Sequence, residues 1–337
     1  MSEVETGREP EVLGAEEASE EAGLELLHAA LRDLRREIRA RASPATPAAT
    51  RPEVAREFDW QAAFDELRHR LGTLGMVERS GKVDEFGMDD VTLARTRLLL
   101  DFLMDRYWRV EVLGLDALDP ERPNLLVANR SGLLPYDGLM LAQAVERWHP
   151  LRERPRFLVA DWLITLPFAQ PYLARLGGVR ACRENADRLL RAGRSVIAFP
   201  EGVKGAAKVF AERYRMKRFG RGGVIRAAVE NRVPLVPVGI VGAEEAHPIL
   251  FKADLPARSL GLPFVPVTPT FPWLGPVGLV PLPTKWVIQV GAPIPLDELD
   301  PAALEDELLL SRLTEELRGR IQDLVGSALD RRASVWG

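Results

Sequence analysis

The chain has 337 residues, of which 46% are hydrophobic and 28% charged, and its formal net charge is −4. This composition is ordinary for a globular protein and gives room for one large domain or two modest ones. The weak net charge excludes a strong overall preference for polyanions, so we expect no nucleic-acid partner.

The cysteine and histidine content and the hydropathy pattern exclude further classes of protein. The only cysteine is Cys182, which excludes an intrachain disulfide and fits a reducing compartment. The four histidines show no metal-ligand spacing, so we expect no metal and no other cofactor. Residues 2–25 do not resemble a signal peptide, and no uncharged apolar run reaches the roughly 18–20 residues that span a bilayer. We therefore expect a soluble or peripheral protein.

Charge is distributed unevenly along the chain. Residues 1–25 hold nine Glu and one Arg, a net charge of −8, whereas residues 151–226 hold 17 Lys or Arg and six Asp or Glu, a net charge of +11. A basic segment of this kind attracts phosphates, coenzyme A or an anionic membrane surface. The alternative is a solvated face whose charges are balanced by their neighbours in the fold.

The N-terminal part predicts an appendage followed by the main domain. Residues 1–20 are rich in Glu and predict disorder, and residues 22–42 have apolar side chains at helical spacing. A Pro/Ala/Thr linker follows over 43–52. We therefore divide the chain into residues 1–53, an acidic tail, helix and linker, and residues 54–337, an α/β domain.

Two helices are predicted at the start of the main domain, over 54–73 and 88–108. Asp89 and Asp90 stand at capping positions of the second helix. This helix is rich in Leu and ends in Tyr107 and Trp108. It would lie either in a membrane interface with its apolar side down or, more often for such helices, against the protein core.

Beyond residue 108, short apolar runs alternate with helical patterns. Strands are predicted over 109–113, 124–128, 156–160, 195–199, 234–241 and 286–290, and helices over 137–147, 165–175, 184–193, 219–231 and 301–328. The alternation predicts an α/β fold with a mixed, largely parallel sheet flanked by helices and an N-terminal helical extension. The Pro-rich residues 248–284 are predicted to be an extended loop, either a lid, a lipid-facing collar or ordinary coil.

Two segments place polar residues directly after an apolar run. In SVIAFPEGVKG (195–205), the strand stops at Pro200, and Glu201, Gly202 and Lys204 follow in a turn. In NLLVANRSGLLPYDG (124–138), an apolar run meets Asn129 and a polar, Gly-containing segment. Open α/β sheets bind ligands at the carboxyl ends of their strands, so both segments are candidate site loops. Neither a GxGxxG nor a GxxxxGK[ST] loop is present, which argues against hydride transfer and P-loop hydrolysis.

With two further blocks, these segments resemble the glycerophospholipid (lysophospholipid or 1-acyl-glycerol-3-phosphate) acyltransferase family, in particular its bacterial branch related to diacylglycerol acyltransferases. The family's blocks are Asn-His followed by Asp, a Gly-rich turn with Arg, FPEG and a Val-Pro-x-Val-Pro strand. Here they correspond to residues 129–138, 177–180, 199–202 and 233–238. The blocks occur in the expected order, and the resemblance covers roughly residues 85–295.

The chain departs from the family pattern at one position. Where the family has its catalytic His, this chain has Arg130. The family's His deprotonates the acceptor hydroxyl, and its Asp, here Asp137, orients the imidazole. Because a guanidinium has no acceptor atom and stays protonated in proteins, Arg130 cannot act as that base.

Three alternatives remain for the missing base. Asp137 acts directly, or His247, just past the Val-Pro strand, reaches the site, although a loop residue is the more common role for such a His. In the third alternative there is no base, and the protein binds lipid or acyl-CoA without turnover; an ion pair between Arg130 and Asp137 would then seal the site. A serine hydrolase using Ser131 is set aside, because the chain lacks the Gly-x-Ser-x-Gly elbow and a nearby His.

The resemblance also implies a set of binding residues. Glu201 and Lys204, helped by Arg180, would hold the polar head of the acceptor, and the start of helix 137–147 would stabilise an oxyanion. The basic run Lys208, Arg213, Arg215, Lys217, Arg218 and Arg221 would suit the phosphates of the donor. The predicted site comprises Arg130 and Asp137 at catalytic positions and Asn129, Ser131, Gly132, Arg180, Glu201, Gly202 and Lys204 at substrate-binding positions.

The resemblance implies an O-acyltransferase that moves a fatty acyl group from acyl-CoA or acyl-carrier protein to a lysophospholipid or another lipid hydroxyl. The alternative is a non-catalytic relative that binds lipid, acyl donor or a partner. Either protein would be cytoplasmic and peripheral on the inner membrane face, with an anionic membrane surface as its partner.

Overall fold

The structure, a computed structural model, describes residues 83–337 except 133, 150–153, 165–169, 254–256, 258–262 and 297–298. The acidic tail, the helices predicted over 22–42 and 54–73, the linker between them and the domain boundary after residue 53 lie outside the described residues, so these stay predictions.

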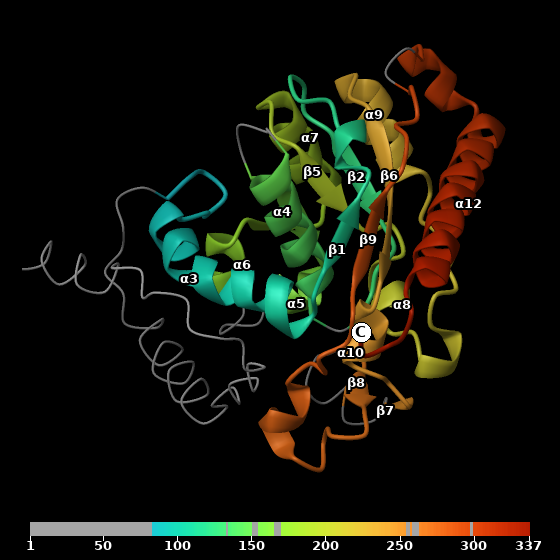
Figure 1. The fold of residues 1–337 in the computed structure, drawn as a ribbon. Helices are drawn as coiled ribbons and strands as arrows, with labels where there is room; N and C mark the ends of the chain where they lie inside the picture. The colour runs from blue at the N-terminus through green and yellow to red at the C-terminus, as the bar shows by residue number, and fades with distance from the viewer. Residues whose placement is uncertain are drawn as a thin grey trace, which may run out of the picture. The chain divides into compact units, whose positions relative to one another are not determined.

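A seven-stranded sheet of order β1-β9-β6-β2-β5-β3-β4 lies at the centre of the described part of the chain (Figure 1). All neighbouring strands run parallel except β6 and β9, which are antiparallel. This confirms the predicted mixed, largely parallel sheet. The strands are β1 (Glu111–Leu113), β2 (Leu125–Ala128), β3 (Arg156–Val159), β4 (Gly178–Arg180), β5 (Val196–Ala198), β6 (Leu235–Val241) and β9 (Val287–Val290).

Six of these strands coincide with the six predicted from the sequence, and β4 is the exception. The segment 177–180 was interpreted as a Gly-rich turn, whereas residues Gly178–Arg180 form the edge strand beside β3. A Cβ at Gly178 would lie 2.8 Å from the carbonyl oxygen of Leu173, so the glycine is needed for close approach of the chain. Three residues are too few to show the alternation by which strands are recognised.

Helices cover both faces of the sheet (Figure 1). They are α3 (Asp90–Phe102), continued by a π-helical segment (Leu103–Tyr107), α4 (Tyr136–Trp148), α5 (Asp161–Ile164), α6 (Gln170–Arg175), α7 (Arg183–Arg191), α8 (Gly202–Ala206), α9 (Gly223–Asn231), α10 (Ala243–Ala246) and α12 (Glu307–Arg331). The helices predicted over 88–108, 137–147 and 184–193 occur with small shifts at their ends.

Two of the predicted helices begin later than expected, each for a local reason. The helix expected over 219–231 starts at Gly223, because Gly222 has a left-handed backbone with φ of +68°. The helix expected over 301–328 starts at Glu307, where the Asp306 carboxylate caps the backbone N–H groups of Leu308 and Leu309. A short 3₁₀ helix, Pro301–Glu305, precedes it.

The side chains of each strand alternate between two hydrophobic clusters. On β2, Leu125 and Val127 face the cluster formed with α7, α9 and α12, whereas Leu126 and Ala128 face the cluster formed with α3 and α4. Because both faces of the sheet are buried, the central strands appear in the sequence as continuous apolar runs.

Helix α3 and the π-helical segment belong to the second of these clusters. Leu100, Met104 and Trp108 are buried there, which supports core packing rather than a membrane interface for this face. Among the described helices, none combines the length and apolar character needed to cross a membrane.

The region predicted as an extended loop over 248–284 is partly structured. It contains a two-stranded antiparallel ribbon of β7 (Phe251–Ala253) and β8 (Val265–Val267). A 3₁₀ helix, Gly275–Leu279, follows the ribbon. The ribbon lies beyond α10, at the sheet edge where β6 ends (Figure 1).

The contact between β6 and α12 gives a test of the packing. A Cβ at Gly239 would lie 2.8 Å from backbone atoms of Leu324 and Val325. We expect Gly239→Ala to lower the free energy of unfolding by about 1–3 kcal/mol, measured by urea denaturation, because backbone cannot yield as a flexible side chain does. In Gly326→Ala, the control within α12, the added methyl meets nothing within 4 Å, so stability should stay equal or rise by up to about 1 kcal/mol. Equal effects of the two changes would contradict this packing.

Candidate functional site

The two loops singled out from the sequence leave the sheet side by side. Strands β2 and β5 are parallel neighbours, with Val127 opposite Ala198, so the segments that follow them emerge at the same end of the sheet. The backbone N–H of Arg130 donates to Oε1 of Glu201 over 2.9 Å. The first and third family-like blocks therefore form one unit at the carboxyl ends of the strands.

Arg130 and Asp137 form a buried ion pair. Nη1 of Arg130 donates to Oδ1 of Asp137; 7% of the Arg130 side chain is exposed, and none of the Asp137 side chain is. The guanidinium also lies over the ring of Phe199, 5.3 Å from its centroid. The Arg130 side chain is therefore held between a carboxylate and an aromatic ring.

Asp137 is held by backbone as well as by Arg130. The N–H of Ser131 donates to Oδ2 over 2.9 Å, and the N–H of Gly138 donates to Oδ1 over 2.8 Å. Burial raises the pKa of the Asp137 carboxyl, and the Arg130 charge and these N–H groups oppose that rise. Three hydrogen bonds leave one of the four acceptor positions of the carboxylate open.

The Glu201 carboxylate is held inside the protein by two backbone N–H groups and by the Lys208 ammonium. Its Oε2 accepts from the N–H of Lys217 over 2.7 Å and lies 3.4 Å from Nζ of Lys208. Lys208 in turn donates to Glu244 over 2.6 Å. The Glu201 side chain is buried, so the predicted role in holding the acceptor's head does not match its position.

The predicted basic run is only partly available to a ligand. Lys208 is buried between Glu201 and Glu244, which corrects the expectation that it faces donor phosphates. Arg213 and Lys217 pair with Glu245 and Glu212. The exposed members without an ion pair to a described residue are Arg215, Arg218 and Arg221.

Asn129, Ser131 and Gly132 shape the loop after β2. The side-chain amide of Asn129 donates to the carbonyl of Ile240 over 2.9 Å and accepts from its N–H over 2.7 Å, so Asn129 ties β2 to β6. The Ser131 hydroxyl is buried and has no hydrogen-bond partner among the described residues. Gly132 has φ of +82°, a left-handed conformation that favours glycine.

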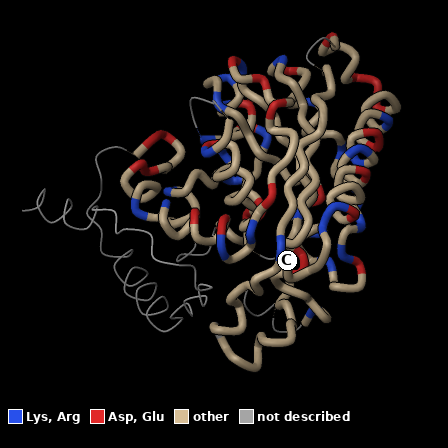
Figure 2. Tube along the Cα trace, in the orientation of Figure 1, with Lys and Arg blue, Asp and Glu red and all other residues tan. Residues whose placement is uncertain are grey.

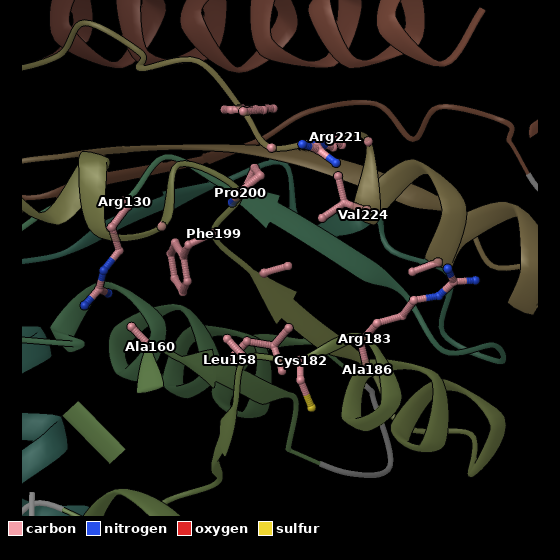
Figure 3. Close-up of a pocket in the computed structure, with 18 of the residues that line it drawn as sticks. Arg130, Leu158, Ala160, Cys182, Arg183, Ala186, Phe199, Pro200, Arg221 and Val224 are labelled. Carbon is pink, nitrogen blue, oxygen red and sulfur yellow. The ribbon is translucent and has the colours of Figure 1, made fainter. Parts of the chain in front are cut away.

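A cavity of about 320 Å³ opens beside these loops (Figure 3). Arg130 and Phe199 stand at one end of it, Arg183 at the other, and Arg221 across from Cys182. The remaining lining is largely apolar, from the sheet and from α7 and α9: Leu125, Leu158, Ala160, Ala186, Ala198, Val224 and Ala227. The cavity is therefore an apolar slot with cationic side chains at its ends.

Gly202 lines the cavity, whereas Arg180 and Lys204 do not. Gly202 has φ of +55°, and a Cβ there would meet nothing within 4 Å. Arg180 is exposed and forms two 2.9 Å hydrogen bonds to Asp161, which lower the pKa of the Asp161 carboxyl. Lys204 lines a separate hollow with Lys217 and Lys252.

His247 is buried outside the residues that line the cavity. Its Nε2 lies 2.7 Å from the carbonyl oxygen of Leu279, and its ring stacks on Tyr136 with centroids 6.0 Å apart. Burial lowers the pKa of His247 and raises the pKa of Tyr136 to about 12. The neutral imidazole therefore donates to a carbonyl and is held by packing, as expected for a loop histidine.

Two residues that support the site were not singled out from the sequence. A Cβ at Gly205 would lie 2.6 Å from Cβ of Glu201 and 2.7 Å from Cβ of Arg130, so only glycine allows α8 to pack on both. Glu244 accepts from Lys208 and from the N–H of Tyr214. The packing role of Gly205 could have been predicted, because Gly205 lies four residues after Glu201 and therefore on the same face of a helical turn. The role of Glu244 could not, because its partners are 30 or more residues away in the sequence.

The buried ion pair predicts a non-additive response to mutation. Asp137→Ala leaves the Arg130 charge buried without a partner, so it should lower the free energy of unfolding by about 3–5 kcal/mol. In an Arg130→Met background the same change should cost clearly less, because no charge is left behind. Chemical denaturation of the wild type, both single variants and the double variant measures the coupling. Additive effects would mean that the pair does not exist.

His247 predicts a pH-dependent stability. Its pKa is lower in the folded than in the unfolded protein, so the unfolded chain binds more protons on acidification. The stability that the neutral ring contributes is therefore present above its unfolded pKa of about 6.5 and is lost as the pH falls below it. His247→Phe keeps an aromatic ring against Tyr136 and should flatten the unfolding free energy between about pH 7 and 5. The same slope in both proteins would contradict this.

Comparison with known proteins bears on this site. Residues 109–241 match the protein-family profile described as Acyltransferase. An uncharacterised protein of Mycobacterium tuberculosis is 42% identical over 255 residues, which cover 75% of this chain and 71% of that protein. One of Mycobacterium leprae is 40% identical over 286 residues, covering 83% and 78%.

Among solved structures, the 1-acyl-sn-glycerophosphate acyltransferase PlsC of Thermotoga maritima is similar, with 18% identity, a TM-score of 0.46 and coverage of 80% of this chain and 90% of that one. The profile match includes the loop of Arg130 and Asp137, the Gly-rich block and the FPEG block. This confirms the family predicted from those blocks, and the chain belongs to the acyltransferase family.

Proposed function

We propose that this protein transfers a fatty acyl group from acyl-CoA or acyl-carrier protein to the hydroxyl of a lysophospholipid or another lipid. The observation that carries the proposal is the apolar cavity whose one end is formed by both family blocks, at Arg130 and at Phe199, Pro200 and Gly202. Its volume of about 320 Å³ lies within the range of small-ligand pockets.

The cavity suits the two chemical parts of an acyl donor. Its apolar walls suit a hydrocarbon chain, whose burial is favoured by about 0.8 kcal/mol for each methylene group. Arg221, at its rim and without an ion pair to a described residue, suits the phosphates of coenzyme A or of the carrier's phosphopantetheine, whereas Arg183 at the other end is paired with Glu230. Since Glu201 is buried, Lys204 in the neighbouring hollow is the residue that would bind the acceptor's polar head.

In this reaction Arg130 would supply positive charge, and it would not act as the base. Its guanidinium can stabilise the oxygen of the donor carbonyl as negative charge develops there. Asp137 is the carboxylate closest to it, and burial moves the pKa of Asp137 towards the range of a useful base. Because Asp137 has no exposed surface, the Arg130 side chain must move aside before an acceptor hydroxyl reaches the carboxylate.

A second candidate function is binding without turnover. It is favoured by the Arg130–Asp137 ion pair, which fills the place of the family's base. Such a protein would bind an acyl donor, a lipid or a partner in the same cavity. Both candidates would act in the cytoplasm as peripheral proteins on the inner membrane face.

Arg130→His tests the two candidates against each other. General-base catalysis contributes typically 10²–10⁴-fold, so the wild type should turn over slowly and Arg130→His should raise the rate by about that factor. The assay is single-turnover transfer from labelled acyl-CoA to a panel of lysolipids. Adding Asp137→Ala to Arg130→His should abolish the gain, and Arg191→His on the exposed face of α7 is the matched control.

Each other outcome has a definite meaning. Fast wild-type turnover that falls in Arg130→His would show that Arg130 itself serves the reaction and that the His-type mechanism is wrong here. No turnover in either protein, with acyl-CoA binding retained, would replace acyl transfer by the binding function.

A further inference from the structure

Residues 263–284 contain no charged side chain, and part of this stretch presents large apolar side chains to solvent. We call residues 271–280 the apolar loop. Exposed fractions within it are 76% for Trp273, 58% for Leu274, 62% for Val277 and 53% for Val280. A soluble protein has reason to expose four such neighbours only where they meet a partner or a membrane.

The conformation of the apolar loop is fixed by hydrogen bonds and close packing. The hydroxyl of Thr268 accepts from the N–H of Phe271 over 2.9 Å, and the hydroxyl of Thr270 donates to the carbonyl of Gly278 over 2.9 Å. A Cβ at Gly278 would lie 2.5 Å from the carbonyl oxygen of Thr270, so the loop closes tightly on itself. Its apolar side chains are therefore held outward by its own hydrogen bonds.

The ribbon of β7 and β8 extends this surface and adds positive charge to it. Leu250 and Phe251 are 53% and 56% exposed, and Lys252 stands next to them, opposite Pro266 of β8. Lys252 shares its hollow with Lys204 and Lys217, and Glu212 is the one carboxylate among the residues that line it. A cationic rim thus borders the apolar loop through the ribbon.

This surface lies at the end of the sheet that holds the candidate site. Strand β6 leads through α10 directly into β7, and β2 and β5 end at the same side as β6, because the three strands are parallel. Figure 1 shows the ribbon and the following loop together beyond α10, and Figure 2 shows almost no charge on the loop itself.

We propose that the apolar loop inserts into the boundary between headgroups and acyl chains of an anionic phospholipid bilayer, with Lys252 and its neighbouring lysines on the headgroups. Trp at the water interface, apolar side chains below it and basic side chains beside it are the features that such a boundary selects. The hydroxyls of Thr268 and Thr270, just before the loop, bond to backbone groups of the loop, so this surface offers few hydrogen-bonding side chains, whereas protein interfaces carry about one hydrogen bond per 100–200 Å².

This proposal rests on the proposed function and extends it. Docking of this end of the sheet on a bilayer would bring the lipid acceptor to the cavity. It is nevertheless tested without acyl donor or acceptor. Failure of acyl transfer with intact vesicle binding would concern the active site alone, and failure of vesicle binding would concern the loop alone.

The experiment is flotation of the full-length chain with vesicles of phosphatidylcholine, with and without 30 mol% (about one lipid in three) phosphatidylglycerol, a content chosen to give a strongly anionic surface. Trp273→Ala with Leu274→Ala should lower partitioning roughly tenfold or more on anionic vesicles, because it removes two large apolar side chains. The matched control is Trp148→Ala at the far end of α4, where Trp148 is 46% exposed. It should bind like the wild type.

A charge variant tests the second half of the proposal. Lys252→Glu should weaken binding about fivefold or more on anionic vesicles, from about 1 kcal/mol per basic residue, and change little on neutral ones. Arg191→Glu on α7 is its control. Val277→Asp gives an independent test of the loop, and circular dichroism checks that each variant is folded.

Three results would overturn the proposal. The first is vesicle binding that neither loop variant lowers, and the second is an equal loss with Trp148→Ala. The third is a change of oligomeric state or of the protection of residues 1–82 from protease in the loop variants, with vesicle binding unchanged. That result would assign the loop to a second copy or to the N-terminal segment.

Discussion

The carboxylate of Glu201 is the constraint on which the site depends. It accepts from the backbone N–H groups of Arg130 and Lys217 and lies against the ammonium of Lys208. A single buried carboxylate thus fixes the loop after β2, the turn after β5 and the segment beyond α8. Since a buried charge must be compensated, these three segments have little freedom to move independently.

The ion pair of Arg130 and Asp137 is built onto that frame and changes its chemistry. An imidazole beside Asp137 would exchange protons near neutral pH, whereas a guanidinium only donates. Gly202 lines the cavity next to it, and Gly205 lets α8 pack closely on Arg130. The described site therefore combines an apolar cavity with a buried ion pair in which the cation has no proton acceptor.

The features on which the two proposals rest lie at one end of the sheet. The cavity, the lysine-lined hollow and the apolar loop all follow strands that end at this edge or the short α10 that continues one of them. In a parallel sheet the loops after the strands gather at one edge, which lets separate segments of the chain act at one place.

The sequence by itself determined the fold class, six of the seven strands of the main sheet and the loops that carry the site. Those features follow from local chemistry: apolar runs form buried strands, and Pro200 and the polar residues after Ala128 end them. It also determined that Arg130 is no base, because that is a property of the side chain alone.

Tertiary structure decided which of the predicted residues line the cavity and which are bound inside the protein. The sequence predicts Glu201 and Lys208 as site charges, yet Lys208 lies in the interior between the carboxylates of Glu201 and Glu244. Asn129 read as a binding residue, yet its amide bonds the backbone of Ile240, 111 residues away. Partners so distant leave no pattern in one sequence, because the contact depends on how strands and helices pack and not on spacing along the chain.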